Sequence, residues 1–312
     1  MVPGSACVSQ AALGVSPRAP EAAAGRRPHH ARCPPVGVLQ PAESRMARIR
    51  NASALCRARD RRKGSFIAFV NRLDRRNVPY LSHSKVSCLE RCPRCYYDLY
   101  VLRERQDSTA LQVGSLFHLA AKSFYQSFRA HVLPKPAAVL KHGKLKRLPK
   151  ESQVKLRNAV TLLRDNHWDG HEVVSIEEPF FMDLAVGLPP IIGILDLVLR
   201  RNGSLVLVDH KTSKSFNELD PAQLILYAEH LRRQHGTQCV VGVFDEYRLV
   251  IDLSTIRKPA FRRTPVSVDR SLLPALIRRY RQAWKQIVAM HRDGEPSGSL
   301  DCWVCNKRDF WY

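Results

Sequence analysis

Two short apolar runs that each end in an aspartate constrain the fold of this chain more than any other feature. Ile191–Leu195 leads into Asp196, and Leu205–Val208 leads into Asp209. The residues between the runs include 200–204, which contain Asn-Gly, the dipeptide typical of tight hairpin turns. We therefore expect two antiparallel strands that bring the two acids to neighbouring positions.

A lysine follows the second aspartate at a spacing that matters. Lys211 lies two residues after Asp209, so both side chains belong to the same face of the predicted strand. Two carboxylates can hold a divalent cation, and the lysine can stabilise the charge that develops on a phosphorane. Taken alone, an Asp-x-Lys triplet is more often a surface ion pair. The hairpin and Asp196 favour a site of metal-dependent hydrolysis.

The charge of the chain indicates the kind of partner. Lysine and arginine number 50 against 28 acidic residues, which gives a formal net charge of +22. Such an excess favours a polyanion, and nucleic acid is the obvious one. A non-catalytic nucleic-acid-binding protein would carry the same excess, so charge does not separate a binder from an enzyme. No apolar run reaches the length of a membrane span, and we predict no membrane partner.

Other polar residues are candidates for the same site. Gln223 and Tyr227 are four residues apart in a predicted helix, so they share one face and could hold a nucleic-acid strand. His118 lies in an apolar helix; such a histidine is usually a boundary residue, but beside two aspartates it is a nitrogen ligand for a metal such as Mn²⁺. Of Glu177 and Glu178, one could reach the site, and Glu178 is the additional candidate.

Cysteine spacing predicts a second metal site. The chain has nine cysteines, an odd number that argues against a secreted disulfide framework and for a reduced, cytoplasmic location. Cys92–Cys95 and Cys302–Cys305 both have C-x-x-C spacing. Two such pairs can supply four thiolates to one Zn²⁺ or to one iron–sulfur cluster. Cys88, one helical turn before Cys92, is a possible additional ligand. The metal would join an N-terminal helix to the C-terminus.

The periodicity of the remaining chain predicts an α/β fold, a mixed sheet core flanked by helices with an N-terminal helical part. We expect helices at 82–105, 111–130, 151–168, 221–235 and 267–292, an unpacked basic loop at 133–150, and strands at 172–184, 191–200, 205–211, 238–247 and 249–253. Residues 1–63 are expected to form a disordered basic N-terminal extension. Met46 is an alternative start, and a transit peptide is the competing interpretation of 1–45.

The motifs occur in the order found in one family. The matching segments are Leu81–Ser84 leading to Cys92–Tyr97, Gly114–His118, Gly193–Asp196, Val208–Thr212 and Gln223–Tyr227. In these segments the chain resembles the PD-(D/E)XK nuclease superfamily, and above all its RecB-like branch and the related CRISPR-associated exonucleases with iron–sulfur clusters. The resemblance implies a restriction-endonuclease-like core within a nuclease domain at 64–312, with a helical part at 80–170, a catalytic core at 172–255 and a C-terminal helix and cysteine tail at 267–312.

The resemblance also implies roles for individual residues. His118, Asp196, Asp209 and the main-chain carbonyl of His210 would bind Mg²⁺ or Mn²⁺. Lys211 would be the catalytic lysine, with Gln223 and Tyr227 orienting the DNA strand. Cys92, Cys95, Cys302 and Cys305 would bind a 4Fe–4S cluster or Zn²⁺; relatives with a cluster take three cysteines from the tail, whereas this tail offers two.

The implied activity is that of a metal-dependent DNA nuclease, in the first place an exonuclease on single strands or DNA ends, in repair, recombination or related DNA processing. The chain has no helicase motifs, so any unwinding would come from a helicase partner. Two alternatives remain: a nuclease of CRISPR adaptation, and a non-catalytic nucleic-acid-binding protein with a structural metal site.

Overall fold

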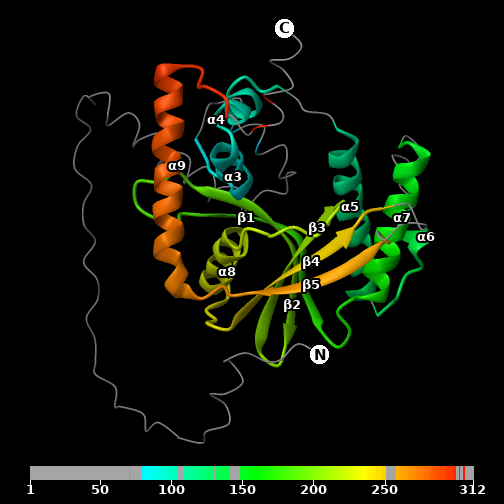
Figure 1. Ribbon diagram of the computed structural model, residues 1–312. Helices are drawn as coiled ribbons and strands as arrows, with labels where there is room; N and C mark the ends of the chain where they lie inside the picture. The colour runs from blue at the N-terminus through cyan, green and yellow to red at the C-terminus, as the bar shows by residue number, and fades with distance from the viewer. Residues whose placement is uncertain are drawn as a thin grey trace, which may run out of the picture. The chain divides into compact units, whose positions relative to one another are not determined.

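The computed structural model describes residues 70, 73, 79–104, 108–129, 131–140, 148–250, 258–299, 302 and 305. The expected extension at 1–63 lies outside them. A five-stranded sheet forms the centre of this part of the chain (Figure 1). Its strands are β1 (Glu172–Met182), β2 (Ile191–Arg201), β3 (Ser204–Ser213), β4 (Val240–Arg248) and β5 (Ala260–Val266).

The strands follow one another across the sheet in chain order, β1-β2-β3-β4-β5. Neighbours pair antiparallel except for β3 and β4, which are parallel and are connected through α8 (Ala222–His235). The β2–β3 hairpin turns at Asn202 and Gly203, whose φ angles of 50° and 78° are the two left-handed conformations that an Asn-Gly turn requires. The predicted mixed α/β sheet with its hairpin is confirmed.

Helices cover the sheet on both faces (Figure 1). One hydrophobic core joins the sheet to α8, α3 (His83–Arg91), α4 (Pro93–Tyr96) and α9 (Leu273–Asp293). A second core on the other face joins it to α5 (Thr109–Arg129) and α7 (Lys150–Asp165). Alternate residues of β3 supply the two cores: Leu205 and Leu207 face the first, Val206 and Val208 the second. Asp209 and Lys211 therefore continue the row that faces α8.

The helix expected at 82–105 is not continuous. It divides into α3, α4 and a π-helical turn, Tyr97–Val101. Pro93 lacks a backbone N–H and disfavours the helical conformation of the residue before it, and Cys92 accordingly is extended, with φ −162° and ψ 110°. Because of this break, Cys92 and Cys95 lie at the N-terminus of α4 and not along one side of a long helix.

Three other boundaries differ from the expectation. The described part of the stretch 133–150 contains a short helix, α6 (Pro136–Val139), and its Val139 and Leu140 are buried, so this part does pack. Of the strand expected at 249–253, Leu249 and Val250 are not in a strand, and 251–253 lie outside the described residues; β5 follows at 260–266. A 3₁₀ turn, Arg270–Leu272, precedes α9, which begins at Leu273. Within the described ranges, no helix combines the length and the hydropathy of a membrane-crossing segment.

Candidate active site

The strands β2 and β3 separate where the two aspartates lie. Their pairing ends at Leu197 opposite Val208, and Asp196 and Asp209 are the next residue on each strand. The Asp196 Oδ2 accepts a hydrogen bond from the backbone N–H of His210 at 2.8 Å, which fixes this carboxylate across the opening between the strands. The hairpin thus places the two acids near each other, as the sequence predicted.

A distortion of β1 adds a third carboxylate. Glu177 lies on β1 opposite Asp196, and its φ of 49° is a left-handed conformation that is uncommon for a non-glycine residue. The neighbouring strand β2 is irregular at the same level, because Leu195 packs into one hydrophobic core and Leu197 packs into the core on the other face of the sheet. In a regular strand, residues two apart share a face. The irregularity directs Glu177 and Asp196 to the same place.

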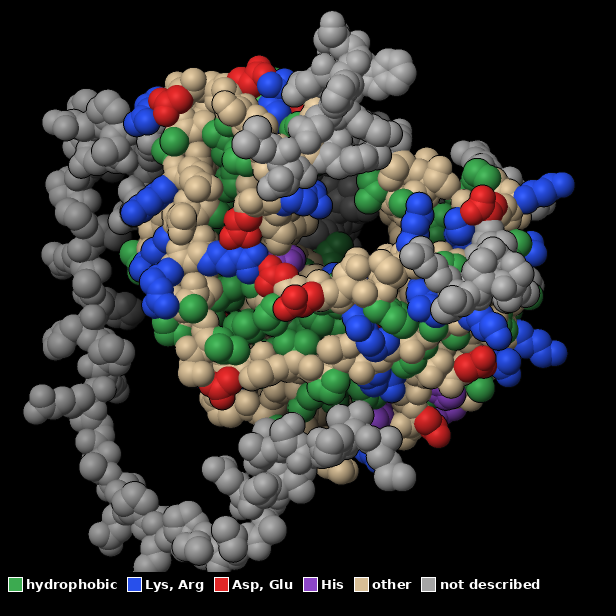
Figure 2. Space-filling view, in the orientation of Figure 1, with side chains coloured by type: hydrophobic (Ala, Val, Ile, Leu, Met, Phe, Trp, Pro, Cys, Tyr) green, Lys and Arg blue, Asp and Glu red, His purple; other side chains and the backbone are tan. Residues whose placement is uncertain are grey.

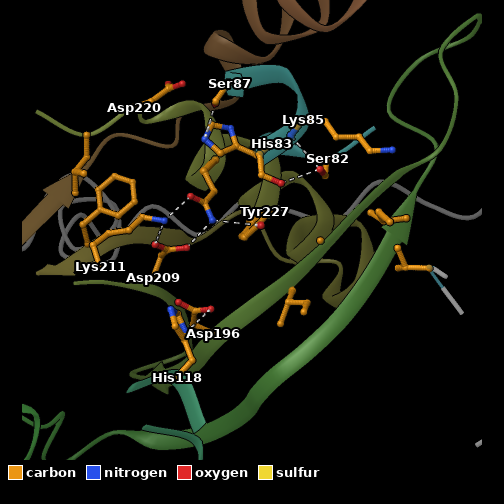
Figure 3. A pocket seen from close by; sticks show the side chains of 18 of the residues that line it. Ser82, His83, Lys85, Ser87, His118, Asp196, Asp209, Lys211, Asp220 and Tyr227 are labelled. Carbon is orange, nitrogen blue, oxygen red and sulfur yellow. Dashed lines mark hydrogen bonds and ion pairs between the residues drawn. The ribbon is translucent and has the colours of Figure 1, made fainter. Parts of the chain in front are cut away.

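His118 of α5 meets these two carboxylates. Its Nδ1 lies 3.3 Å from Glu177 Oε1 and 3.5 Å from Asp196 Oδ1, and one ligand atom of each of the three residues lies within 4.8 Å of the others. Figure 3 shows His118 beside Asp196. Burial alone would lower the pKa of His118, but the contact with Glu177 and the charge of Asp196 outweigh it and raise the pKa to about 9. Burial and the charge of Asp209 raise the pKa of Asp196.

Of the two adjacent glutamates, Glu178 was the predicted candidate for the site. In the structure it is Glu177 that contacts His118. Consecutive strand residues point to opposite faces, and Glu178 lies 3.4 Å from Gln234 Nε2, away from His118. The sequence holds no local signal that distinguishes the two glutamates, since the choice depends on the distorted backbone of β1.

Lys211 belongs to a second, contiguous cluster. Its Nζ lies 2.6 Å from Asp209 Oδ2 and donates to Gln223 Oε1 at 2.8 Å. The Gln223 amide nitrogen donates to Asp209 Oδ1 at 2.6 Å and to the Tyr227 hydroxyl at 3.3 Å. Burial would lower the pKa of Lys211, but the contact with Asp209 outweighs it and raises the pKa. The lysine is therefore a cation in this protein. Four predicted site residues are together here.

The side chain of His210 points away from both clusters. It is buried against Phe117, Tyr125 and Tyr247 on the opposite face of the sheet, and burial lowers its pKa to about 3. Only the backbone of His210 is at the site, where its N–H binds Asp196. A contribution of this residue to metal binding would have to come from its main-chain carbonyl, as the resemblance implied.

The donor set of the first cluster fits a hard divalent cation. Glu177 and Asp196 each offer a carboxylate oxygen to this group, and His118 offers one imidazole nitrogen. Carboxylate oxygens are the ligands that Mg²⁺ and Mn²⁺ prefer, and one nitrogen is compatible with Mn²⁺. Asp209 lies outside the close group and is held by Lys211 and Gln223. It borders the same cavity and would be the further oxygen ligand.

One cavity of about 670 Å³ is lined by residues of both clusters, His118 and Asp196 of the first and Asp209, Lys211, Gln223 and Tyr227 of the second (Figure 3). The wall that faces Asp209 and Lys211 is the N-terminal turn of α3, with Ser82 and His83. A bridge between Leu81 and Ile191 of β2 fixes this turn. Burial, together with the charge of Lys211, lowers the pKa of His83 to about 4, although Asp220 opposes the shift, so the imidazole is neutral at pH 7.

No role was predicted for His83, because its place in the cavity depends on the contact between two segments more than one hundred residues apart. The motif Leu81–Ser84 indicated a helix start and nothing about what that helix would face.

The four cysteines of the two C-x-x-C pairs converge at the other end of α3. Cys92, Cys95, Cys302 and Cys305 are all buried, and their sulfurs lie within 4.8 Å of one another. Cys88 is also buried, in α3, but is not part of the group. The structure therefore brings together the four predicted thiols and leaves out the additional candidate. Such a set can bind a soft metal.

A comparison with protein families agrees with this geometry. The family model of the PD-(D/E)XK nuclease superfamily matches residues 80–310. The chain therefore belongs to the PD-(D/E)XK nuclease superfamily. The match spans the cavity, both clusters around it and the cysteine tail. None of the curated proteins compared with the chain matches it.

A comparison with solved structures matches the chain to a protein from Eubacterium rectale that is provisionally named an exonuclease. It is 15% identical, with a TM-score of 0.48, over 75% of this chain and 90% of that one. A second structure, of a protein named SSO0001, is 15% identical with a TM-score of 0.26, over 58% of this chain and 80% of that one. With TM-scores below 0.5, neither likeness bears on the function of this chain.

Proposed function

We propose that this chain is a DNA nuclease that hydrolyses phosphodiester bonds with Mg²⁺ or Mn²⁺, acting on single strands or DNA ends. The observation that supports the proposal is one cavity with two adjoining clusters: a carboxylate–imidazole group around Asp196, and the Lys211 cation held by Asp209 and Gln223. In a metal-dependent hydrolase of phosphodiesters, a cation-binding site activates the water and a positive side chain stabilises the charge on the phosphate.

The residues of the site have different roles in the proposed reaction. His118, Glu177, Asp196 and Asp209 would hold the divalent cation, which when bound supplies a Lewis acid for the phosphate and a more acidic water. Lys211 remains protonated and binds a non-bridging phosphate oxygen, where it stabilises the charge of the transition state. Gln223 keeps the lysine ammonium group in position, and the neutral His83 borders the space that the phosphate would enter.

Two observations favour DNA strands or ends. The net charge of +22 suits a polyanion, and Arg278, Arg281 and Lys285 are exposed along the outer face of α9. In Figure 2 basic side chains follow this helix on the face that also contains the cavity opening. The cavity lies between the start of α3 and the sheet, and we propose that a single strand enters it.

We place the protein in the reduced interior of the cell, in DNA repair or recombination, with unwinding supplied by a helicase partner. Each of the six described cysteines is free, which fits a reducing compartment. A role in CRISPR adaptation would use the same chemistry.

The test is a nuclease assay on single- and double-stranded DNA, and on RNA, with Mg²⁺ or Mn²⁺ and with EDTA. We expect metal-dependent cleavage of DNA by the wild-type chain. In Lys211→Ala, cleavage should fall at least about 10²-fold while DNA binding persists, since one preorganised donor is typically worth that much in rate. DNA binding without metal-dependent cleavage by the wild-type chain would instead establish the non-catalytic alternative, and a preference for RNA would correct the substrate.

A further inference from the structure

The cysteine site of this chain does not fit the group that its resemblance to cluster-bearing nucleases implies. We infer that Cys92, Cys95, Cys302 and Cys305 bind a single tetrahedral Zn²⁺ ion and not a 4Fe–4S cluster. The inference concerns the metal alone and does not depend on which nucleic acid the protein cleaves.

The distances between the sulfur atoms set the size of the site. Three of the sulfur pairs, Cys92–Cys305, Cys95–Cys302 and Cys95–Cys305, are separated by 3.4, 3.4 and 3.7 Å. Every pair among the four lies within 4.8 Å. With Zn–S bonds of about 2.3 Å, the sulfurs of a regular tetrahedral site are about 3.8 Å apart. The observed separations match such a site.

The same distances leave too little room for a cluster. Four sulfurs within 4.8 Å of one another stand at most about 2.9 Å from their common centre, and a metal–thiolate bond of about 2.3 Å takes up most of that length. In a 4Fe–4S cluster each thiolate binds its own iron, and four irons and four sulfides must lie between the ligands. The space at the centre admits one ion.

The surrounding chain closes tightly on the sulfurs. Cys92, Cys95, Cys302 and Cys305 are at most 8% exposed. The backbone at Gly298 passes so close that an added Cβ would lie 3.3 Å from Cys305 Sγ. The Ser299 N–H donates to Cys92 Sγ at 3.5 Å, an interaction that stabilises a thiolate ligand. An expansion of the site to cluster size would have to displace this segment.

The spacing of the four cysteines in the sequence also favours zinc. The four ligands come as two C-x-x-C pairs, the arrangement of zinc ribbons and related structural sites. The first pair spans the N-terminus of α4, where the extended Cys92 is followed by Pro93. A zinc ion here would fix the C-terminal segment to α3 and α4, and α3 forms the far wall of the cavity. The site would be structural and redox-inert.

Metal analysis tests the inference. The full chain is produced in cells supplied with both iron and zinc and purified anaerobically, and metal content, acid-labile sulfide and the visible spectrum are measured. We expect about one zinc per chain, no sulfide and no visible absorption. After exchange with Co²⁺, the absorption bands of a tetrahedral cobalt tetrathiolate should appear. Four irons and four sulfides per chain, with broad visible absorption, or the absence of stoichiometric metal, would overturn the inference.

Three variants locate the zinc and separate it from the catalytic site. Cys88→Ser changes a buried thiol of α3 outside the group and should keep one zinc per chain. Cys305→Ser removes one ligand and should lower zinc occupancy after dialysis against a chelator. Asp209→Ala should keep the zinc whatever its effect on cleavage, so failure of the nuclease proposal and failure of the zinc proposal are distinguishable. Full zinc occupancy in Cys305→Ser would count against the site.

Discussion

Gln223 holds Lys211 in place: the lysine ammonium group donates to the Gln223 amide oxygen at 2.8 Å while the amide nitrogen of the same side chain donates to Asp209 at 2.6 Å. A long flexible side chain is thereby fixed from two directions, by an ion pair with Asp209 and by a neutral acceptor. The acceptor comes from α8, so the position of the lysine depends on how that helix packs on the sheet.

The first prediction concerns this positioning. Gln223→Ala frees the ammonium group of Lys211 and should lower kcat about 10- to 100-fold with a small change in KM, because a misplacement of about 1 Å can cost up to 10²-fold in rate. Gln223→Glu keeps an acceptor for Lys211 but replaces the donor to Asp209 with a second carboxylate, so it should not recover the loss. Steady-state kinetics on single-stranded DNA provides the measurement. Gln234→Ala, at the other end of α8, is the matched control and should leave kcat unchanged.

The second prediction distinguishes the two glutamates of β1. Glu177→Gln removes a carboxylate within 3.3 Å of His118 and should raise the Mn²⁺ concentration needed for half-maximal activity at least about tenfold, the usual size of such an effect on metal affinity. Glu178→Gln, the neighbouring change on the opposite face, should leave the metal requirement as it is. Metal titrations of activity and of Mn²⁺ binding test the pair. Equal behaviour of the two variants would contradict the assignment of Glu177.

The third prediction is a pH dependence of metal binding. His118 has a pKa raised to about 9 in the metal-free protein, so at pH 7 it carries a proton that a metal ligand must lose. Metal binding then releases that proton, and affinity should rise as pH increases, by up to about tenfold per pH unit, until it levels off near pH 9. Calorimetric titration with Mg²⁺ at several pH values measures the slope. In His118→Gln the binding should be weaker and its pH dependence shallower.

The contrast between local and distant contacts explains what the sequence could predict. The Asn-Gly turn, the alternation of β3 and the two-residue step from Asp209 to Lys211 are local, and local periodicity specifies them. The two cysteine pairs were recognisable for the same reason. The break at Cys92 was also readable, since Pro93 disfavours a helical residue before it.

The features that escaped prediction depend on contacts across the fold. Glu177 reaches the site through a left-handed residue in β1, and the position of His83 depends on the pairing of Leu81 with Ile191. The strand β5 was missed because charged pairs replace apolar alternation there. Arg262 and Arg263 bind Glu246 and Asp245 of β4, so the strand carries arginines where a half-buried strand is expected to be apolar.

The fourth prediction concerns the close approach of α8 to β2. A Cβ at Gly193 would lie 2.6 Å from the ring of Phe180 and 3.0 Å from that of Tyr227. Gly193→Ala should therefore destabilise the protein by about 1–3 kcal/mol, the usual cost of overpacking, and displace Tyr227 from Gln223. Chemical denaturation and kcat report the two effects. The double variant Gly193→Ala, Phe180→Leu, which removes the larger clash, should regain stability; if it does not, steric contact is not the cause.

The last prediction tests the basic face of α9. Arg278, Arg281 and Lys285 are exposed, and none of them has an acidic side chain within ion-pair distance among the described residues, whereas Arg279 on the inner side pairs with Glu90 and Asp220.

If single-stranded DNA follows this face, changing the three outer cations to glutamine should weaken binding. The slope of log affinity against log salt should fall by up to about 2.1, since each phosphate contact of a single strand contributes about 0.7. At saturating DNA, kcat should be unchanged because the residues lie outside the cavity. The matched control changes three exposed cations of α5 and α7, Arg129, Lys150 and Arg157, which alters net charge equally. A similar loss in both triple variants would indicate a general effect of charge and remove α9 as a specific path for DNA.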